Sequence, residues 1–492
     1  MMSRFAATVA VAVAGFATTA LAVRLLGTSR YGTLALGLAI VGLVGVAGRL
    51  GLGTAATRRI AAMRAAGDQI GIEHTAQAVT TLMISQAILG SGLVAGLIYF
   101  TQREHGAAVA LLLGAGLGFL LLGVSTTAAG QAIAQGMGRM VLMEVPYLVL
   151  VLLQLLVAVV LTVLGVSDIV AMALGFGAAG ALCSVITGGL IRGTLSGAGH
   201  LFRPAARHAI ELIVLAGPYA VAAVSGQIIS RFDVLVLGLT HTSAVVGGYE
   251  STLRVVDAFL LLIPGILMAP YVPAATMIFT RGDPAGFRDL YIFVSKLAYL
   301  GSLPLILALL AFPGVVLRAF FGAHYPVARG IVWILLAGYV INLAFGLNTQ
   351  ALIASGQRRV LAKVYLVALV SMIGLAFALI PLFGATGAAL STASSYIVLN
   401  VGVGLALFRS TGASPFRADM ITLLLTSLLP VVSVLFVRGL VPHPSVPLVL
   451  FTSVGLWAAW LGVVLWTRSI TVKQLLELIP RRRKRSEGTI LE

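Results

Sequence analysis

Three ionisable residues lie close together in a long apolar segment of the second half of the chain. Glu250, Arg254 and Asp257 are separated by four and three positions, which places all three on one face of a helix. Two chemistries fit this pattern. Either the three groups neutralise one another as a salt-bridge ladder, or Arg254 keeps part of its guanidinium free to bind a diphosphate through forked hydrogen bonds. The spacing alone leaves both interpretations open.

Other charged residues lie within or at the edges of apolar segments. They are Arg24, Arg49, Arg231 with Asp233 beside it, and Lys296. A charge that faces lipid costs several kcal/mol, so such residues usually face a wet cavity or a partner. Arg24 and Arg231 lie close enough to segment ends to reach the lipid headgroups instead. Lys296 is nearer still to a segment end, so it is a weaker candidate for ligand contact.

The elements that must hold these charges are membrane-spanning helices. The 492-residue chain is 60% hydrophobic and 10% charged, with a mean hydropathy of +1.08. A soluble domain is about a quarter charged, so this chain has too little polar surface for one. With about 20 apolar residues per span, the sequence predicts an all-α polytopic membrane protein of about fourteen spans. They lie near 6–27, 33–53, 77–100, 108–130, 141–164, 169–191, 211–231, 245–272, 291–314, 328–354, 361–383, 385–408, 419–440 and 446–467.

Most of the 32 Lys and Arg residues fall in every second gap between these spans. The positive-inside rule therefore predicts that both chain ends are cytoplasmic, with a first helix that is retained and not cleaved as a signal peptide. Basic loops beside anionic lipid explain the net charge of +17 without nucleic acid. The predicted cytoplasmic groups include Arg203, Arg207 and the run from Arg481 to Arg485. The opposite side holds only Arg24, Arg30, Arg103, Arg318, Arg329 and Arg438.

The two halves of the chain repeat each other. Because six spans separate the matching motifs, an even number, the halves have the same orientation, as in transporters that hold substrate between two parallel lobes. We predict a six-helix lobe over 1–200, a second over 201–410, two further helices over 411–470 and a basic cytoplasmic tail over 471–492. Three motifs recur at offsets of 207 to 219 residues: Tyr31-Gly-Thr-Leu as Tyr249-Glu-Ser-Thr-Leu, Gln131-Ala as Gln350-Ala, and Phe176-Gly-Ala-Ala-Gly-Ala as Phe383-Gly-Ala-Thr-Gly-Ala.

An ordered set of motifs carries a family resemblance. Arg24-Leu-Leu-Gly-Thr-Ser-Arg-Tyr-Gly and Gly51-Leu-Gly-Thr-Ala-Ala-Thr-Arg-Arg-Ile frame the second predicted span. From about residue 5 to about 410 the chain resembles polysaccharide and oligosaccharide-lipid flippases of the multidrug/oligosaccharidyl-lipid/polysaccharide (MOP) exporter superfamily. The second half contributes Asp233 with Leu235-Val-Leu-Gly, Val246-Gly-Gly-Tyr249, Pro270, Gly282-Asp283, Phe321-Gly-Ala-His-Tyr325 and the Phe383 motif.

The resemblance implies a V-shaped, two-lobed bundle in a bacterial-type inner membrane. It implies transport of an undecaprenyl-diphosphate-linked oligosaccharide from the cytoplasmic to the outer leaflet, with glycosyltransferases and a polysaccharide polymerase as further partners. The first, second, seventh and eighth helices of that fold line its cavity, and Arg24 matches a cavity-facing arginine of related lipid II flippases. The candidate cavity residues are Arg24, Arg49, Arg231, Asp233, Tyr249, Glu250, Arg254 and Asp257, with Lys296 as a weaker member.

Other functions fit the sequence less well. A drug or cation antiporter of the same superfamily would use buried carboxylates and few arginines, whereas the embedded arginines here favour an anionic substrate. A lipid II flippase is a second alternative. A glycan polymerase or other membrane enzyme would need a large extracytoplasmic loop for its catalytic residues, and the predicted outer loops are short, so we expect a transporter and not an enzyme. A scaffold without transport would not need duplicated halves.

No metal site or cofactor is expected from the residue pattern. The seven His residues are scattered without ligand spacing, and the single cysteine, Cys183, lies within a predicted span, where a packing role is expected. Coupling of transport to H⁺ or Na⁺ through Glu250 or Asp257 stays open.

Overall fold

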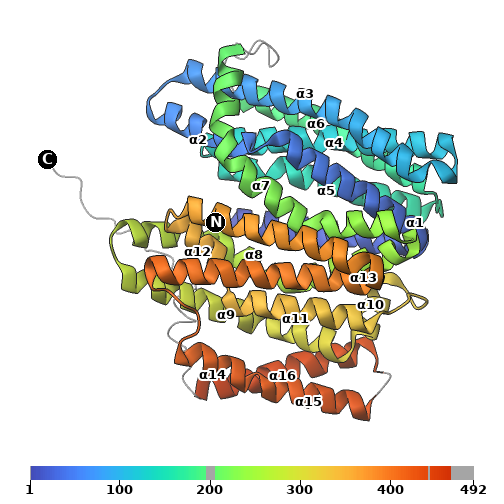
Figure 1. The fold of residues 1–492 in the computed structure, drawn as a ribbon, viewed down its shortest axis with the longest axis vertical. Helices are drawn as coiled ribbons and strands as arrows, with labels where there is room; N and C mark the ends of the chain where they lie inside the picture. Colours follow the sequence, from blue (N-terminus) through green and yellow to red (C-terminus); the bar gives the residue numbers. More distant parts are fainter. Residues whose placement is uncertain (1, 195–205, 442–443, 467–492) are drawn as a thin grey trace, which may run out of the picture.

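The computed structural model describes residues 2–194, 206–441 and 444–466, and within these ranges the chain forms helices and no β-strand (Figure 1). Arg203 and the predicted tail over 471–492, with Arg481 to Arg485, lie outside the described residues. The helices are α1 (Met2–Arg49), α2 (Leu52–Ala65), α3 (Gln69–Gln102), η1 (Arg103–His105), α4 (Ala107–Gly136), α5 (Met140–Val163), α6 (Ile169–Thr194), α7 (Ala206–Thr240), α8 (Ser243–Thr280), α9 (Pro284–Ala311), α10 (Pro313–Phe321), α11 (Arg329–Phe345), α12 (Asn348–Ala354), α13 (Arg358–Thr411), α14 (Ala418–Thr426), α15 (Leu428–Leu440) and α16 (Val446–Trp466).

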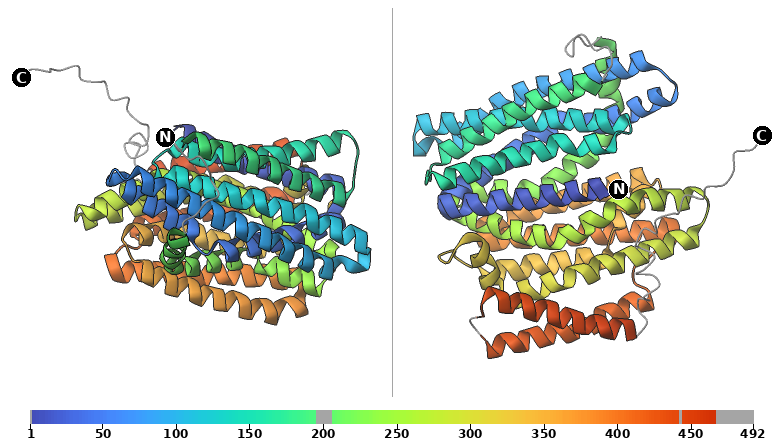
Figure 2. Two further views of the ribbon diagram at one scale, coloured as in Figure 1. Left: turned by 90° about the horizontal axis from the view of Figure 1, so that it is seen from above. Right: turned by 180° about the vertical axis from the view of Figure 1, so that it is seen from behind.

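The two longest helices, α1 and α13, are hairpins whose arms meet at a glycine. The turns are at Gly27 (φ 72°, ψ 170°) and Gly384 (φ 56°, ψ −131°), where the positive φ favours glycine. The arms of α1 run back along each other, so Val11 and Val41 line the same cavity (Figure 2). Twelve helical segments are long and apolar enough to cross a membrane. Counting the arms of α1 and α13 separately gives the predicted fourteen spans within the described residues.

The turns between helices gather at two ends of the bundle. We call one the Gly27 end, which also holds the turns at 241–242 and 322–328. The other is the α2 end, which holds α2 and the turns at 137–139 and 281–283. Successive spans therefore alternate in direction, as a chain threaded through a bilayer must.

The third and ninth spans begin with the same local structure. Gly67 and Gly282 each have φ of 73°, and the aspartate that follows each caps the next helix. Asp68 Oδ1 accepts a hydrogen bond from the Gly71 amide at 2.8 Å, and Asp283 Oδ1 accepts one from Gly286 at 2.8 Å. Such a cap satisfies an amide that the helix leaves without a partner. The equivalent caps start spans six apart, which agrees with an internal repeat.

The helices form two groups with α1 and α7 between them. Helices α3–α6 pack together, as do α8, α9 and α11–α13, while α1 contacts α3 and α5 on one side and α8 on the other (Figures 1 and 2). Helix α7 packs against α2 and α3 and also against α13. Helices α14–α16 pack on α9 and α10 at the outside of the second group.

At the Gly27 end α1 and α8 meet backbone to backbone. A β-carbon built at Gly32 of α1 would overlap the carbonyl oxygen of Ser243 on α8, and one built at Gly247 would overlap that of Thr28. The Thr33 hydroxyl also lies 3.1 Å from the Ser243 hydroxyl. Only glycine permits this approach, so the groups are closely packed at this end.

At the α2 end, α2 and α7 make a charged contact. Arg59 of α2 donates to Glu211 of α7 at 2.5 Å, with the two side chains 19% and 37% exposed. The rings of His74 and His208 lie 5.0 Å apart beside this pair, on α3 and α7. Helix α7 therefore closes this end of the bundle by polar contacts.

The outer surface of the bundle is apolar, as membrane insertion requires. Leu89, Val163 and Leu382 are 76 to 79% exposed, on helices from both groups. Large exposed apolar areas of this kind mark contact with lipid or with another protein. They agree with a multi-pass membrane protein.

We expect Gly247→Ala to lower stability by about 1–3 kcal/mol, because the added methyl group forces the two backbones apart. Gly248→Ala is the matched control, since a β-carbon there meets nothing within 4 Å and alanine favours the helix. Thermal unfolding of both variants in the same detergent, followed by circular dichroism, provides the comparison. Equal midpoints for Gly247→Ala and the wild type would contradict the backbone contact.

Candidate substrate cavity

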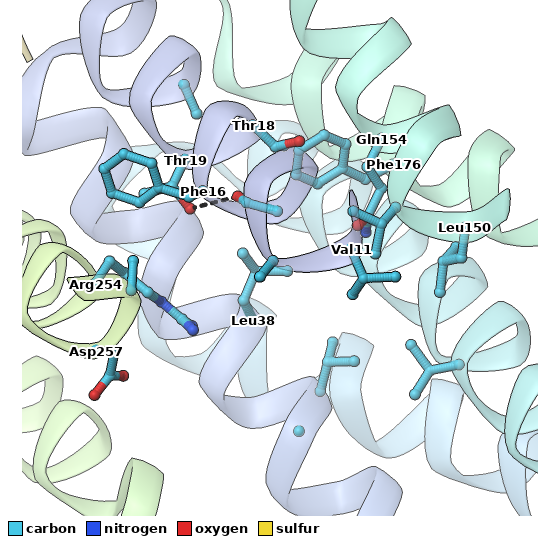
Figure 3. Close-up of a pocket in the computed structure, with 18 of the residues that line it drawn as sticks. Val11, Phe16, Thr18, Thr19, Leu38, Leu150, Gln154, Phe176, Arg254 and Asp257 are labelled. Carbon is cyan, nitrogen blue, oxygen red and sulfur yellow. Dashed lines mark hydrogen bonds between the residues drawn. The ribbon is translucent and has the colours of Figure 1, made fainter. Parts of the chain in front are cut away.

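A cavity of about 530 Å³ lies within the bundle around α1. Its size falls in the range typical of small-molecule sites. One wall comes from α4, α5 and α6 and the other from α7 and α8, with both arms of α1 between them (Figure 3). The polar or aromatic residues that line it include Phe16, Thr18, Thr19, Tyr31, Tyr147, Gln154, Phe176, Gln227, Arg231, Arg254 and Asp257.

The charged centre of the cavity wall is a carboxylate shared by two arginines. Glu250 Oε1 accepts from Arg231 Nη1 at 2.7 Å and from Arg254 Nε at 2.8 Å. The Glu250–Arg254 contact is the i, i+4 pair that helical spacing predicts. Arg231 reaches the same oxygen from α7, so the cluster joins two helices.

The three side chains differ in exposure, so the arginines and not the glutamate face the cavity. The Glu250 side chain is 3% exposed, whereas those of Arg231 and Arg254 are 18% and 32% exposed and line the cavity. The carboxylate therefore lies behind the guanidinium groups. Within the described residues, Arg254 uses only its Nε and Arg231 only its Nη1 for hydrogen bonds to the protein. The other N–H groups of the two guanidinium groups are therefore available to a ligand.

Asp257 lines the same wall one turn further along α8, but it bonds outside the arginine pair. The Tyr339 hydroxyl of α11 donates to its Oδ1. The predicted face of Glu250, Arg254 and Asp257 is therefore present, and its third member is held by a residue that helical spacing could not reveal.

Asp233 and Tyr249 lie behind the cavity and not in its lining. Asp233 Oδ2 accepts from the Tyr249 hydroxyl at 2.5 Å and from the Thr392 hydroxyl at 2.8 Å, while its Oδ1 accepts from the Val234 amide at 2.8 Å. Asp233 and Tyr249 are 1% and 0% exposed. This buried network links α7, α8 and α13, which places the two residues in the support of the wall.

Arg24 and Arg49 are not among the lining residues and bind main-chain carbonyls, although the carbonyl that Arg49 contacts belongs to Val124, which lines the cavity. Arg24 donates from Nε to Phe320 O and from Nη2 to Ala319 O, each at 2.5 Å. These carbonyls end α10, where a cation is favoured by the helix dipole. Arg49 ends α1 and its Nη1 lies 3.4 Å from Val124 O.

Lys296 connects two helices near the α2 end. Its Nζ lies 3.1 Å from Asp419 Oδ2, which joins α9 to α14, and Lys296 is not among the cavity residues. Of the predicted charged candidates, the structure brings only Arg231, Arg254 and Asp257 to the cavity surface.

Several neutral cavity residues were not singled out by sequence reasoning. Gln154 had a usable signal, since it is the only polar residue in the apolar run 148–161. Gln227 lies one helical turn before Arg231 on α7, which also places it on the cavity side. Phe176 begins one of the repeated motifs but was not identified as a cavity residue, and Tyr147 had no signal, because aromatic residues are common in membrane helices.

Comparisons with known proteins agree with this geometry. The family described as "Polysaccharide biosynthesis protein" matches residues 2–279, more than half of the chain. The "Probable low-salt glycan biosynthesis flippase Agl15" of Haloferax volcanii is 23% identical over 201 residues, which cover 41% of this chain and only 42% of that protein. None of the matched proteins described here is named as an enzyme, in agreement with the prediction from sequence.

Solved structures share the fold at low sequence identity. "Lipid II flippase MurJ, inward closed conformation" superposes with a TM-score of 0.74 at 16% identity, over 95% of this chain and 99% of that one. An inward-facing multidrug resistance MATE family transporter of the MOP superfamily gives 0.61 at 16% identity, over 82% and 94%. The described helices thus have the fold of MOP superfamily transporters, and the chain belongs to the polysaccharide biosynthesis protein family.

Proposed function

We propose that this protein is a flippase that carries an undecaprenyl-diphosphate-linked oligosaccharide from the cytoplasmic to the outer leaflet. The observation that supports this most directly is the pair of guanidinium groups, Arg231 and Arg254, that line the cavity in front of a buried Glu250. Guanidinium binds phosphate oxygens through forked hydrogen bonds, so the wall suits a diphosphate. The family description and the name of the Haloferax relative support a role in glycan biosynthesis, and the relative is named as a flippase.

The distribution of basic residues supports an orientation with the α2 end in the cytoplasm. Several arginines at the Gly27 end have local partners: Arg24 caps α10, Arg30 donates to the carbonyl of Ser167, and Arg438 lies 5.4 Å from the Trp333 ring. Both chain ends then face the cytoplasm of an inner membrane. The basic residues of the α2 end include Arg58, Arg59, Arg64, Arg139, Arg192, Arg281, Arg288, Arg359, Lys363, Arg409 and Arg417.

Transport then proceeds by alternating access of the two helix groups. Substrate enters at the α2 end when Arg59 and Glu211 separate, while the contact between Gly32 and Gly247 keeps the outer end closed. Release requires the opposite arrangement. The enzymes that assemble the glycan supply the substrate on the cytoplasmic side, and the polymerase that uses it acts on the outer side.

An antiporter of drugs or cations is less well supported. Two of the three charged lining residues are arginines, which repel a cationic substrate. The buried Asp233 carboxylate already accepts hydrogen bonds from Tyr249 and Thr392.

Deletion of the gene tests the proposed function. We expect the deletion strain to accumulate one undecaprenyl-diphosphate-linked oligosaccharide on the cytoplasmic leaflet, because synthesis continues while transfer stops. Extraction of the lipid-linked intermediates and mass spectrometry would identify it. Normal surface glycan together with an unchanged lipid pool would overturn the proposal.

Arg254→Ala tests the diphosphate site. We expect binding of undecaprenyl diphosphate to weaken about 10- to 100-fold, as for the loss of a hydrogen bond to a charged group, and export of the glycan to stop. Glu250 keeps Arg231 as a partner, so the protein should still fold. Arg281→Ala, an exposed basic residue outside the cavity, is the control. Wild-type binding and export in Arg254→Ala would exclude the arginine from substrate binding.

Glu250→Gln tests whether the shared carboxylate is structural. We expect it to lower stability by about 3–5 kcal/mol, because two largely buried guanidinium groups lose their counter-charge. The amount of protein in the membrane fraction should fall, and Glu250→Asp should recover part of it. A normal amount of Glu250→Gln protein that fails to export glycan would instead place Glu250 in the transport step.

A further inference from the structure

The two walls of the cavity differ in chemistry. All three charged lining residues, Arg231, Arg254 and Asp257, come from α7 and α8. The lining residues from α1, α4, α5 and α6 carry no charge, and they include hydroxyl, amide and aromatic side chains. In Figure 3, Arg254 and Asp257 lie to one side of α1, and Gln154, Phe176 and Leu150 lie to the other. A single ligand that spans the cavity therefore meets a charged wall and a neutral wall.

Gln154 is the polar centre of the neutral wall. It lies in the middle of α5, within the apolar run 148–161, and its side chain lines the cavity. Within the described residues its amide makes no hydrogen bond. Its side chain is only partly buried, so both its N–H donors and its carbonyl acceptor are accessible to a ligand in the cavity.

Aromatic and hydroxyl side chains surround this amide. Phe176 of α6 and Thr18 of α1 lie beside Gln154 in Figure 3, and Tyr147, two helical turns before Gln154 on α5, also lines the cavity. A sugar ring presents apolar C–H faces and a rim of hydroxyl groups. Aromatic rings suit the faces, and an amide, which both donates and accepts, suits the rim.

We propose that Gln154, with Phe176, binds the sugar next to the diphosphate and makes the cavity selective for a glycosylated lipid. The inference rests on the proposed function, in which Arg231 and Arg254 bind the diphosphate. The first sugar follows the diphosphate directly, so it is the part of the glycan that reaches the neutral wall while the phosphates stay on the charged one. The charged wall thus binds the diphosphate of the lipid, and the neutral wall recognises the sugar attached to it.

Gln154→Leu tests this subsite with two probes, undecaprenyl diphosphate and the lipid-linked oligosaccharide extracted from the deletion strain. Leucine keeps a similar volume and suits a membrane helix, so insertion should be normal. We expect affinity for the oligosaccharide probe to fall about 10-fold, as for a lost hydrogen bond and an unpaired sugar hydroxyl, and affinity for undecaprenyl diphosphate to stay unchanged. Titration of the purified protein in nanodiscs measures both.

Two variants provide the controls. Leu156→Ala changes a lipid-facing residue of the same helix, 56% exposed, and should leave both affinities unchanged. Gln154→Asn keeps a shorter amide and should give an intermediate affinity for the oligosaccharide. If Gln154→Leu weakens both probes equally, or neither, the sugar subsite is wrong.

Failure of the subsite and failure of the proposed function give different results. If the wild type binds neither probe, the flippase proposal itself fails. If the wild type binds both probes with equal affinity, the diphosphate site stands and the sugar subsite fails.

Discussion

The sharing of one carboxylate by two arginines sets the character of the cavity. Charges within a membrane protein are tolerated when they pair or face water, and Glu250 offsets Arg231 and Arg254 from the buried side. The geometry leaves the remaining guanidinium donors at the cavity surface. Because Arg231 comes from α7 and Arg254 from α8, the same pairing holds these helices in register. Glu250 Oε1 thus both pairs the two arginines of the cavity wall and joins α7 to α8.

The two ends of the bundle are closed by different forces. At the Gly27 end, Gly32 and Gly247 let two backbones touch over a surface without side chains. Such packing is insensitive to salt and depends only on shape. At the α2 end the partly exposed Arg59–Glu211 pair contributes little net stability, as exposed ion pairs usually do. The α2 end is therefore expected to open more easily than the Gly27 end.

The span pattern could be predicted from the sequence because length and hydropathy determine it. Even the hairpin turns agree with the predicted spans: Gly27 is the last residue of the span 6–27, and Gly384 falls between the spans 361–383 and 385–408. The charged site was only partly predictable. Helical spacing reveals Glu250 with Arg254, since they share one helix. The partners of Arg24, on a helix nearly 300 residues later, depend on tertiary contacts that no local pattern encodes.

Helix α7 connects the salt bridge at the α2 end to the substrate cavity. The helix Ala206–Thr240 carries Glu211, which meets α2, and Arg231, which faces the cavity. Because the two residues share one helix, we expect a displacement that frees Glu211 to shift Arg231 as well. Such a shift would link occupancy of the cavity reciprocally to closure of the α2 end, so that each changes the free energy of the other. The α2 end would then open with a different free energy when the cavity is empty than when it holds a ligand. Such a difference would limit opening and closing without transport.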